Sequence, residues 1–147
     1  MNVLIVEDLG VVRVIADYLK EIERKHLGME LSSFSLDTEN ARANMSKADA
    51  LIVDISQLAG QELAEIALLE RNIPVIGTLF PAPGMIIIES DIFKVIVKPE
   101  FDLARFEQAV MDIHDLYRST KRLHAAASMV KALYQKLDQN RCRCALN

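Results

Sequence analysis

Acidic residues directly follow two short apolar runs in this sequence. Glu7 and Asp8 come after residues 3–6, and Asp54 comes after residues 50–53. Runs of this length, bounded by polar residues, are typical of strands that are buried on both faces of a parallel sheet. Two such strands side by side would bring three carboxylates together at one edge of the sheet. Because like charges repel, the pattern predicts a bound cation or a shifted pKa at this edge.

Two further apolar runs also end in polar residues. Thr78 ends the run 74–78, and Lys98 with Pro99 closes the run 94–98. Simpler interpretations stay open for each of these residues taken alone. Asp54 has the residue type of a helix cap, and Thr78 that of an ordinary strand-end hydroxyl. Lys98 could form a salt bridge with Asp54 and take part in no chemistry.

Strands and helices alternate along the first 117 residues, and this alternation would position the polar side chains. The expected strands are 2–6, 30–36, 50–54, 74–78 and 94–98. The expected helices are 9–25, a short one from Asp37 to about residue 45, and one between Gly60 and about residue 71. Residues 80–84 contain two prolines and a glycine and cannot form a regular helix, whereas 85–91 has room for one or two turns. Such alternation predicts a parallel sheet with helices on both faces.

The composition is that of a globular protein. Half of the 147 residues are hydrophobic, which predicts a single domain with a substantial core. No apolar run approaches the roughly 20 residues that cross a bilayer, and the N-terminus lacks the basic and apolar regions of a signal peptide. We therefore expect a cytoplasmic protein. Trp is absent and aromatic residues are few, which argues against a stacking surface for single-stranded nucleic acid.

Charge divides the chain into an acidic and a basic part. Residues 1–117 hold 10 Lys and Arg against 20 Asp and Glu, whereas residues 118–147 hold 7 against the single acid Asp138. The basic part is therefore expected to contact something that the acidic part does not. Charged helices are usually solvated, so binding to nucleic acid or to a membrane is not expected. Cys142 and Cys144 are too few for a metal site or a disulfide scaffold.

A long helix is expected from Asp102 to about Leu137. Its apolar residues step by four and three, as in a coiled coil, with one slip of a residue; they are Phe106, Val110, Ile113, Tyr117 and Thr120, then Leu123, Ala127, Val130, Tyr134 and Leu137. At about 1.5 Å per residue, such a helix is too long to be covered by a domain of this size. We expect a basic helical extension over residues 118–147 that forms a homodimer or docks on a partner helix. The alternative is a helix that folds back through a break near residues 119–120.

The polar residues form a recognisable set when they are taken in order. An acidic pair follows the first strand, an Asp ends the third, a Thr ends the fourth, and Lys-Pro follows the fifth. This set resembles the receiver domain of two-component response regulators over residues 1 to about 117. The resemblance implies a doubly wound α/β fold, flavodoxin-like, with a five-stranded parallel sheet in the order 2-1-3-4-5. It also implies a signalling domain and not an enzyme.

The resemblance further implies a role for each residue of the set. Asp54 would be the phosphoacceptor, and would take a phosphoryl group from a partner histidine kinase or phosphotransfer protein. Lys98 would place a positive charge on the transferred group, and Thr78 would donate a hydroxyl to it. Mg²⁺ would be held by Glu7, Asp8, Asp54 and the backbone carbonyl of Ser56. Oxygen atoms of this kind are the ligands that Mg²⁺ prefers.

The sequence also departs from the receiver pattern. Gln57 and Leu58 stand where Met-Pro is usual, and Leu79 follows the Thr where a small residue is common. Val95 occupies the place of an aromatic residue that swings inward on activation, and the proline-rich residues 80–84 shorten or replace a helix. The usual relay from the Thr to the aromatic residue cannot operate here in its familiar form.

Two other functions compete with a phosphorylated receiver. The first is a receiver-fold interaction or dimerisation module that does not depend on phosphate. The second is a nucleotide- or flavin-binding enzyme, which needs a loop rich in Gly, Ser or Thr after the first strand. That second function is disfavoured because Glu7 and Asp8 put negative charge where a phosphate would bind.

Overall fold

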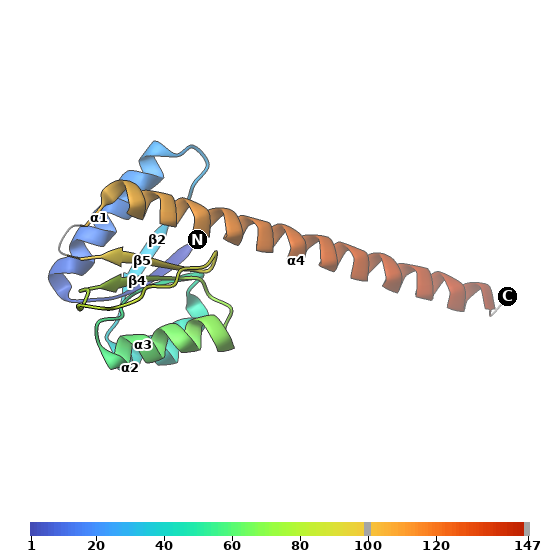
Figure 1. Ribbon diagram of the computed structural model, residues 1–147. Coiled ribbons are helices and arrows are strands. Elements are labelled where there is room, and N and C mark those ends of the chain that lie inside the picture. Colours follow the sequence, from blue (N-terminus) through green and yellow to red (C-terminus); the bar gives the residue numbers. More distant parts are fainter. Residues whose placement is uncertain (99–100, 146–147) are drawn as a thin grey trace. The chain divides into compact units, whose positions relative to one another are not determined.

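The computed structural model describes residues 1–98 and 101–145, with side chains up to residue 139. The elements in chain order are β1 (Asn2–Val6), α1 (Leu9–Lys25), β2 (Ser32–Ser35), α2 (Thr38–Asn44), η1 (Met45–Lys47), β3 (Ala50–Asp54), α3 (Leu58–Glu65), η2 (Ile66–Glu70), β4 (Val75–Leu79), β5 (Phe93–Val97) and α4 (Leu103–Ala145) (Figure 1). Contacts between residues divide the chain into two compact units, Met1–His114 and a second unit that begins at Asp115.

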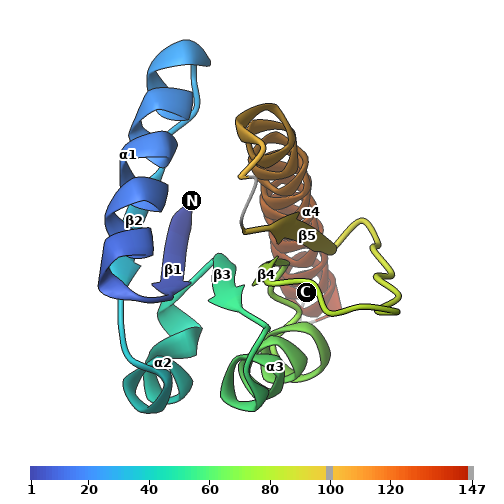
Figure 2. The same ribbon diagram turned by 60° about the vertical axis from the view of Figure 1, so that its left-hand side comes forward.

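The first unit is built on a parallel sheet of five strands. The strand order is β2-β1-β3-β4-β5, which confirms the predicted topology. Helix α1 and the beginning of α4 cover one face of this sheet, and α2 and α3 cover the other (Figure 2). The fold is therefore doubly wound, as the alternation of elements predicts.

The central strands of the sheet contribute to two hydrophobic cores, one on each face. On β1, Val3 and Ile5 pack towards α1 and α4, while Leu4 and Val6 pack towards α2 and α3. Strand β3 alternates in the same way, because successive side chains point to opposite faces of a sheet. Burial on both faces explains why these strands read as continuous apolar runs.

Several elements differ in extent from the sequence prediction, and helix α4 runs to Ala145, beyond the expected end near Leu137. Strand β2 is limited to Ser32–Ser35, since an edge strand with three serines has little apolar surface to bury. Helix α3 begins at Leu58, before Gly60, and its continuation η2 is a π-helical turn. The helical turn that 85–91 had room for is absent: residues 80–92 contain neither helix nor strand.

The second unit belongs to a single helix. Helix α4 is continuous from Leu103 to Ala145, so the alternative of a break near residues 119–120 is wrong. Every side chain from 118 to 139 is exposed. Within the described residues, no helix combines the length and the apolar character that crossing a membrane requires.

Candidate functional site

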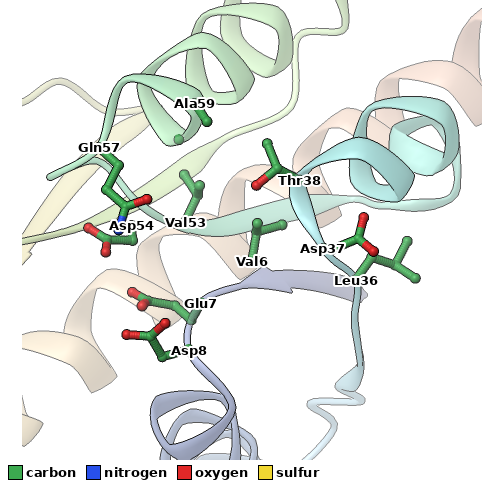
Figure 3. A pocket seen from close by; sticks show the side chains of 11 residues that line it. Val6, Glu7, Asp8, Leu36, Asp37, Thr38, Val53, Asp54, Gln57 and Ala59 are labelled. Carbon is green, nitrogen blue, oxygen red and sulfur yellow. The ribbon is translucent and has the colours of Figure 1, made fainter.

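The predicted polar side chains come together at the carboxyl edge of the sheet. Asp54 is the last residue of β3 and lies opposite Thr78 of β4 in the register of the two strands. Glu7 follows the end of β1, and Lys98 follows the end of β5. Figure 3 shows the carboxylates of Glu7, Asp8 and Asp54 close to one another at the ends of β1 and β3. The arrangement follows from the parallel topology, which brings all strand ends to one edge.

Lys98 lies between two of these carboxylates. Its Nζ is 2.9 Å from Oδ2 of Asp54 and 3.2 Å from Oε2 of Glu7. The Lys98 side chain is only 6% exposed and that of Glu7 is fully buried, whereas that of Asp54 is 16% exposed. Asp54 is therefore the carboxylate of this pair that an incoming molecule can reach.

Glu7 is also bound to the hydroxyl of Thr78. Thr78 Oγ1 donates to Oε1 of Glu7, and lies 3.3 Å from the carbonyl oxygen of Val53. Burial raises the pKa of Glu7, although the charge and hydrogen bond of Lys98 act in the opposite direction. Glu7 is thus the carboxyl group of the site that most readily holds a proton.

Asp54 has the opposite electrostatic character. Burial acts to raise its pKa, but hydrogen bonds from Lys98 and from Ser56 outweigh burial and leave the pKa below its usual value. The backbone N–H of Ser56 donates to Oδ1 of Asp54 at 2.8 Å. Asp54 is therefore ionised at neutral pH.

Gly60 allows α3 to pack directly on the backbone of Asp54. A Cβ atom at position 60 would lie 1.7 Å from the carbonyl oxygen of Asp54, a distance that no side chain can adopt. Sequence analysis treated Gly60 as a residue that precedes the helix and missed this role. The available signal was a glycine inside a helical pattern, which often marks a close approach of backbone.

Phe80 is a second residue of the site that sequence analysis missed. Its backbone N–H donates to Oγ of Ser56 at 2.9 Å, and its ring centroid lies 4.8 Å from Nζ of Lys98. Phe80 is 56% exposed, and its ring and the Lys98 ammonium group are in cation–π contact. An aromatic residue two positions after Thr78 was the only sequence signal.

An open pocket adjoins the carboxylates. Its volume is about 220 Å³, and it lies between the ends of β1 and β3 and the beginnings of α2 and α3. Its lining includes Glu7, Asp8 and Asp54 together with Asp37 and Thr38 of the α2 terminus (Figure 3). Four acidic residues around one opening favour a cation over an anion as the first ligand.

The carboxylates do not form a ready-made metal cage. Among the side chains that the structure describes, in residues 1–98 and 101–139, no group of three or more His, Cys, Asp or Glu is placed to hold a metal ion. The Glu7 carboxylate is already engaged by Lys98 and Thr78. Mg²⁺ keeps several waters and is often bound by one or two carboxylates, so Asp8 and Asp54 at an open pocket are a donor set that fits it.

Comparisons with known proteins agree with this architecture. No family model and no curated protein matches the chain. One structural neighbour is a two component transcriptional regulator AraC from Clostridium phytofermentans, with a TM-score of 0.60 and 20% sequence identity. The alignment covers 83% of this chain and 98% of the neighbour's chain. Another is the response regulator StyR, with a TM-score of 0.65 and 16% sequence identity. That alignment covers 91% of this chain and 69% of the StyR chain. The fold is that of a response-regulator receiver domain.

Proposed function

We propose that this receiver-fold chain is a phosphoacceptor of a two-component phosphorelay, with Asp54 as the phosphorylated residue. The observation that supports it is the paired environment of Asp54: an ionised carboxylate, 2.9 Å from Lys98, at the edge of an open acidic pocket. A histidine kinase or phosphotransfer protein would be the donor, and the chain would be its substrate and not a turnover enzyme.

The transfer itself needs little more than positioning and charge. A carboxylate oxygen of Asp54 attacks the phosphorus atom of a phosphohistidine in line with the breaking P–N bond. The new O–P bond forms as the electron pair of the old bond leaves on the imidazole nitrogen of the donor. Lys98, already within 2.9 Å of Asp54, lies close enough to stabilise the negative charge on the phosphoryl oxygens.

Thr78 and Lys98 must change partners when Asp54 is phosphorylated. Both side chains now bind Glu7, through the Thr78 hydroxyl and the Lys98 ammonium group. Phosphoryl oxygens are strong acceptors and would compete with Glu7 for both donors. Loss of these donors would leave Glu7 buried, so its proton affinity would rise further. The phosphorylated state would then differ from the free state in the Glu7 hydrogen bonds first.

Mg²⁺ is the cofactor that the residues of the pocket fit. Asp8 and Asp54 would be its carboxylate ligands, with the carbonyl of Ser56 as a third oxygen and Glu7 in support. A bound Mg²⁺ would neutralise charge on the phosphoryl oxygens during transfer. Lys98 alone offsets only one of the three carboxylates, so a second cation is electrostatically favourable.

A phosphate-independent interaction module is the second candidate function. It is favoured by Val95, a fully apolar residue that is 1% exposed on β5, and by the absence of a helix from residues 80–92. Both features remove parts through which receivers signal phosphorylation. The two candidates differ in one measurable property, which is the transfer of a phosphoryl group to Asp54.

The test is labelling with acetyl phosphate and Mg²⁺, followed by intact-mass measurement. Wild type is expected to gain one phosphoryl group, Asp54→Asn none, and the reaction is expected to stop when Mg²⁺ is chelated. Asp17→Asn, at an exposed position of α1, is the matched control and should label as wild type does. Labelling of Asp54→Asn would show that another residue is the acceptor, and no labelling of wild type would leave the interaction module as the better function.

A further inference from the structure

Large apolar side chains are exposed along the second unit of the chain. They belong to residues 123–137 of α4, and each has between 51% and 69% of its surface exposed: Leu123, Met129, Val130, Leu133, Tyr134 and Leu137. Single exposed apolar residues are ordinary, but a continuous row of them indicates a surface that is covered by a partner.

The row has the spacing of a coiled-coil seam. Leu123, Ala126, Val130, Leu133 and Leu137 are separated by three, four, three and four residues, which are alternating a and d positions of a heptad. Ala127 and Tyr134 at e, and Met129 at g, widen the same apolar face. Val at a and Leu at d in the central heptad is the combination that favours two parallel strands.

The area available is sufficient for a specific pair. Taking on the order of 100 Å² for each of the six large side chains, two copies would bury about 1,200 Å² together. This value reaches the lower end of the range for specific protein–protein interfaces. The alanines at 126 and 127 let two helices approach closely in the middle of the seam.

The charges leave most of the seam undisturbed. In a parallel pair, position g faces position e of the following heptad on the other helix. Arg122 would face Ala127, and Met129 would face Tyr134, so the central contacts contain no like-charge pair. Lys136 would face Arg141 at the end of the seam, where like charges are best tolerated because water screens them.

The spacing of the apolar residues, and not the charge, favours a second helix over an anionic surface as the partner. A helix that lies on a membrane has basic side chains along its polar face and inserts its apolar face. Basic residues lie on the polar face here too, at Lys121 and Lys131, but the apolar residues keep the alternating three- and four-residue spacing of a helix–helix seam. We propose that residues 120–137 of α4 pair with the same segment of a second copy of this chain as a parallel two-stranded coiled coil.

The mass of the full-length protein in solution tests the pairing. Sedimentation equilibrium of the unphosphorylated chain is expected to give twice the chain mass of 16.5 kDa. The double variant Val130→Asp with Leu137→Asp should be a monomer, because each change puts a charge into the seam. The control Ala125→Asp with Ala132→Asp adds the same charges on the opposite side of the helix and should remain a dimer. Since all four positions are exposed, none should alter the fold of residues 1–114.

Disulfide trapping tests the register and direction. In a background of Cys142→Ser and Cys144→Ser, Ala126→Cys at a d position should form an intermolecular disulfide on mild oxidation. Ala125→Cys, the neighbouring residue outside the seam, should not. In an antiparallel pair centred on Val130, position 126 would not face itself.

The proposal is overturned by a monomeric wild type, by an assembly of more than two copies, or by equal trapping at 125 and 126. A monomer that binds vesicles containing anionic lipid would show that the surface is covered by a membrane. The outcome is separate from the proposed phosphorylation, because both measurements use the chain without a phosphodonor.

Discussion

The strand-edge site and the C-terminal helix distribute polarity in opposite ways. At the site, charged groups are buried: Lys98 is 6% exposed and Glu7 is fully covered. On the helix, apolar groups are exposed: every large apolar side chain from Leu123 to Leu137 has at least half of its surface in solvent. Buried charges cost free energy that a structural salt bridge rarely recovers, so such clusters mark chemistry. Exposed apolar rows cost solubility, so they mark a partner.

The two regions also differ in the hydrogen bonds that a ligand or partner would have to replace. Among the described residues, no buried side-chain nitrogen or oxygen lacks a hydrogen-bond partner. The side chains of Lys98, Thr78, Glu7 and Asp54 are therefore already paired with one another. A ligand must replace existing bonds there. The exposed apolar surface of α4 makes no hydrogen bonds, so a partner can cover it without replacing any.

Removing Lys98 should give the largest loss of stability and tests whether the charges of the site are buried ion partners. Lys98→Met leaves Glu7 and Asp54 without their shared cation, and a buried charge that loses its partner costs about 3–5 kcal/mol. Urea unfolding should show this loss, and labelling of Asp54 should fall sharply. Lys131→Met, on the exposed helix, should stay within about 0.5 kcal/mol of wild type. Equal effects of the two changes would show that Lys98 is not a buried ion partner.

Gly60→Ala should give the next largest effect. The added Cβ would lie 1.7 Å from the carbonyl oxygen of Asp54, so α3 must shift, at a cost of about 1–3 kcal/mol. Gly10→Ala is the matched control, since Gly10 lies in a helix and a Cβ there meets nothing within 4 Å. That variant should be stabilised by about 0.5–1 kcal/mol. Chemical denaturation measures both. Stabilisation of Gly60→Ala would contradict the close packing of α3 on Asp54.

Much of the site could be predicted from the sequence, because its polar residues stand at or directly after the ends of apolar runs. Glu7, Asp54, Thr78 and Lys98 each sit at or one residue beyond the end of an apolar run, and parallel pairing brings those ends together. Gly60 and Phe80 could not be assigned in the same way. Their roles depend on the approach of α3 and of the chain after β4, which are properties of tertiary packing.

The fold likewise has features that the local sequence pattern predicts and others that depend on tertiary contacts. The order of the strands follows from alternation and handedness, so it was predictable. The sequence leaves room for a helical turn over residues 85–91, but no helix forms there. The structure supplies another bond pattern in its place: Glu89 accepts the N–H of Val95 and the guanidinium of Arg105. A side chain that caps an edge strand in this way leaves no periodic pattern in the sequence.

The pH dependence of stability should give the smallest effect. It tests the difference between the two carboxyl groups of the site, Glu7 and Asp54. Because the pKa of Glu7 is raised above 4.5 in the folded protein, the folded state holds this proton more tightly than the unfolded state does. Stability from Glu7 is therefore fully present below pH 4.5 and is lost as the pH rises through the raised pKa. Glu7→Gln has no proton to lose, so its stability relative to wild type should increase across this window and then level off.

Asp54 should behave with the opposite sign, which makes Asp54→Asn the control. Its pKa lies below 3.8, so its contribution is present above that pH and is lost as the pH falls through the lowered pKa. The stability of Asp54→Asn relative to wild type should thus improve only on acidification, whereas that of Glu7→Gln improves as the pH rises. Urea unfolding over a pH series measures both differences. Parallel curves for the two variants would mean that Lys98 balances the two carboxylates equally, and the assignment of Asp54 as the reactive carboxylate would lose its electrostatic basis.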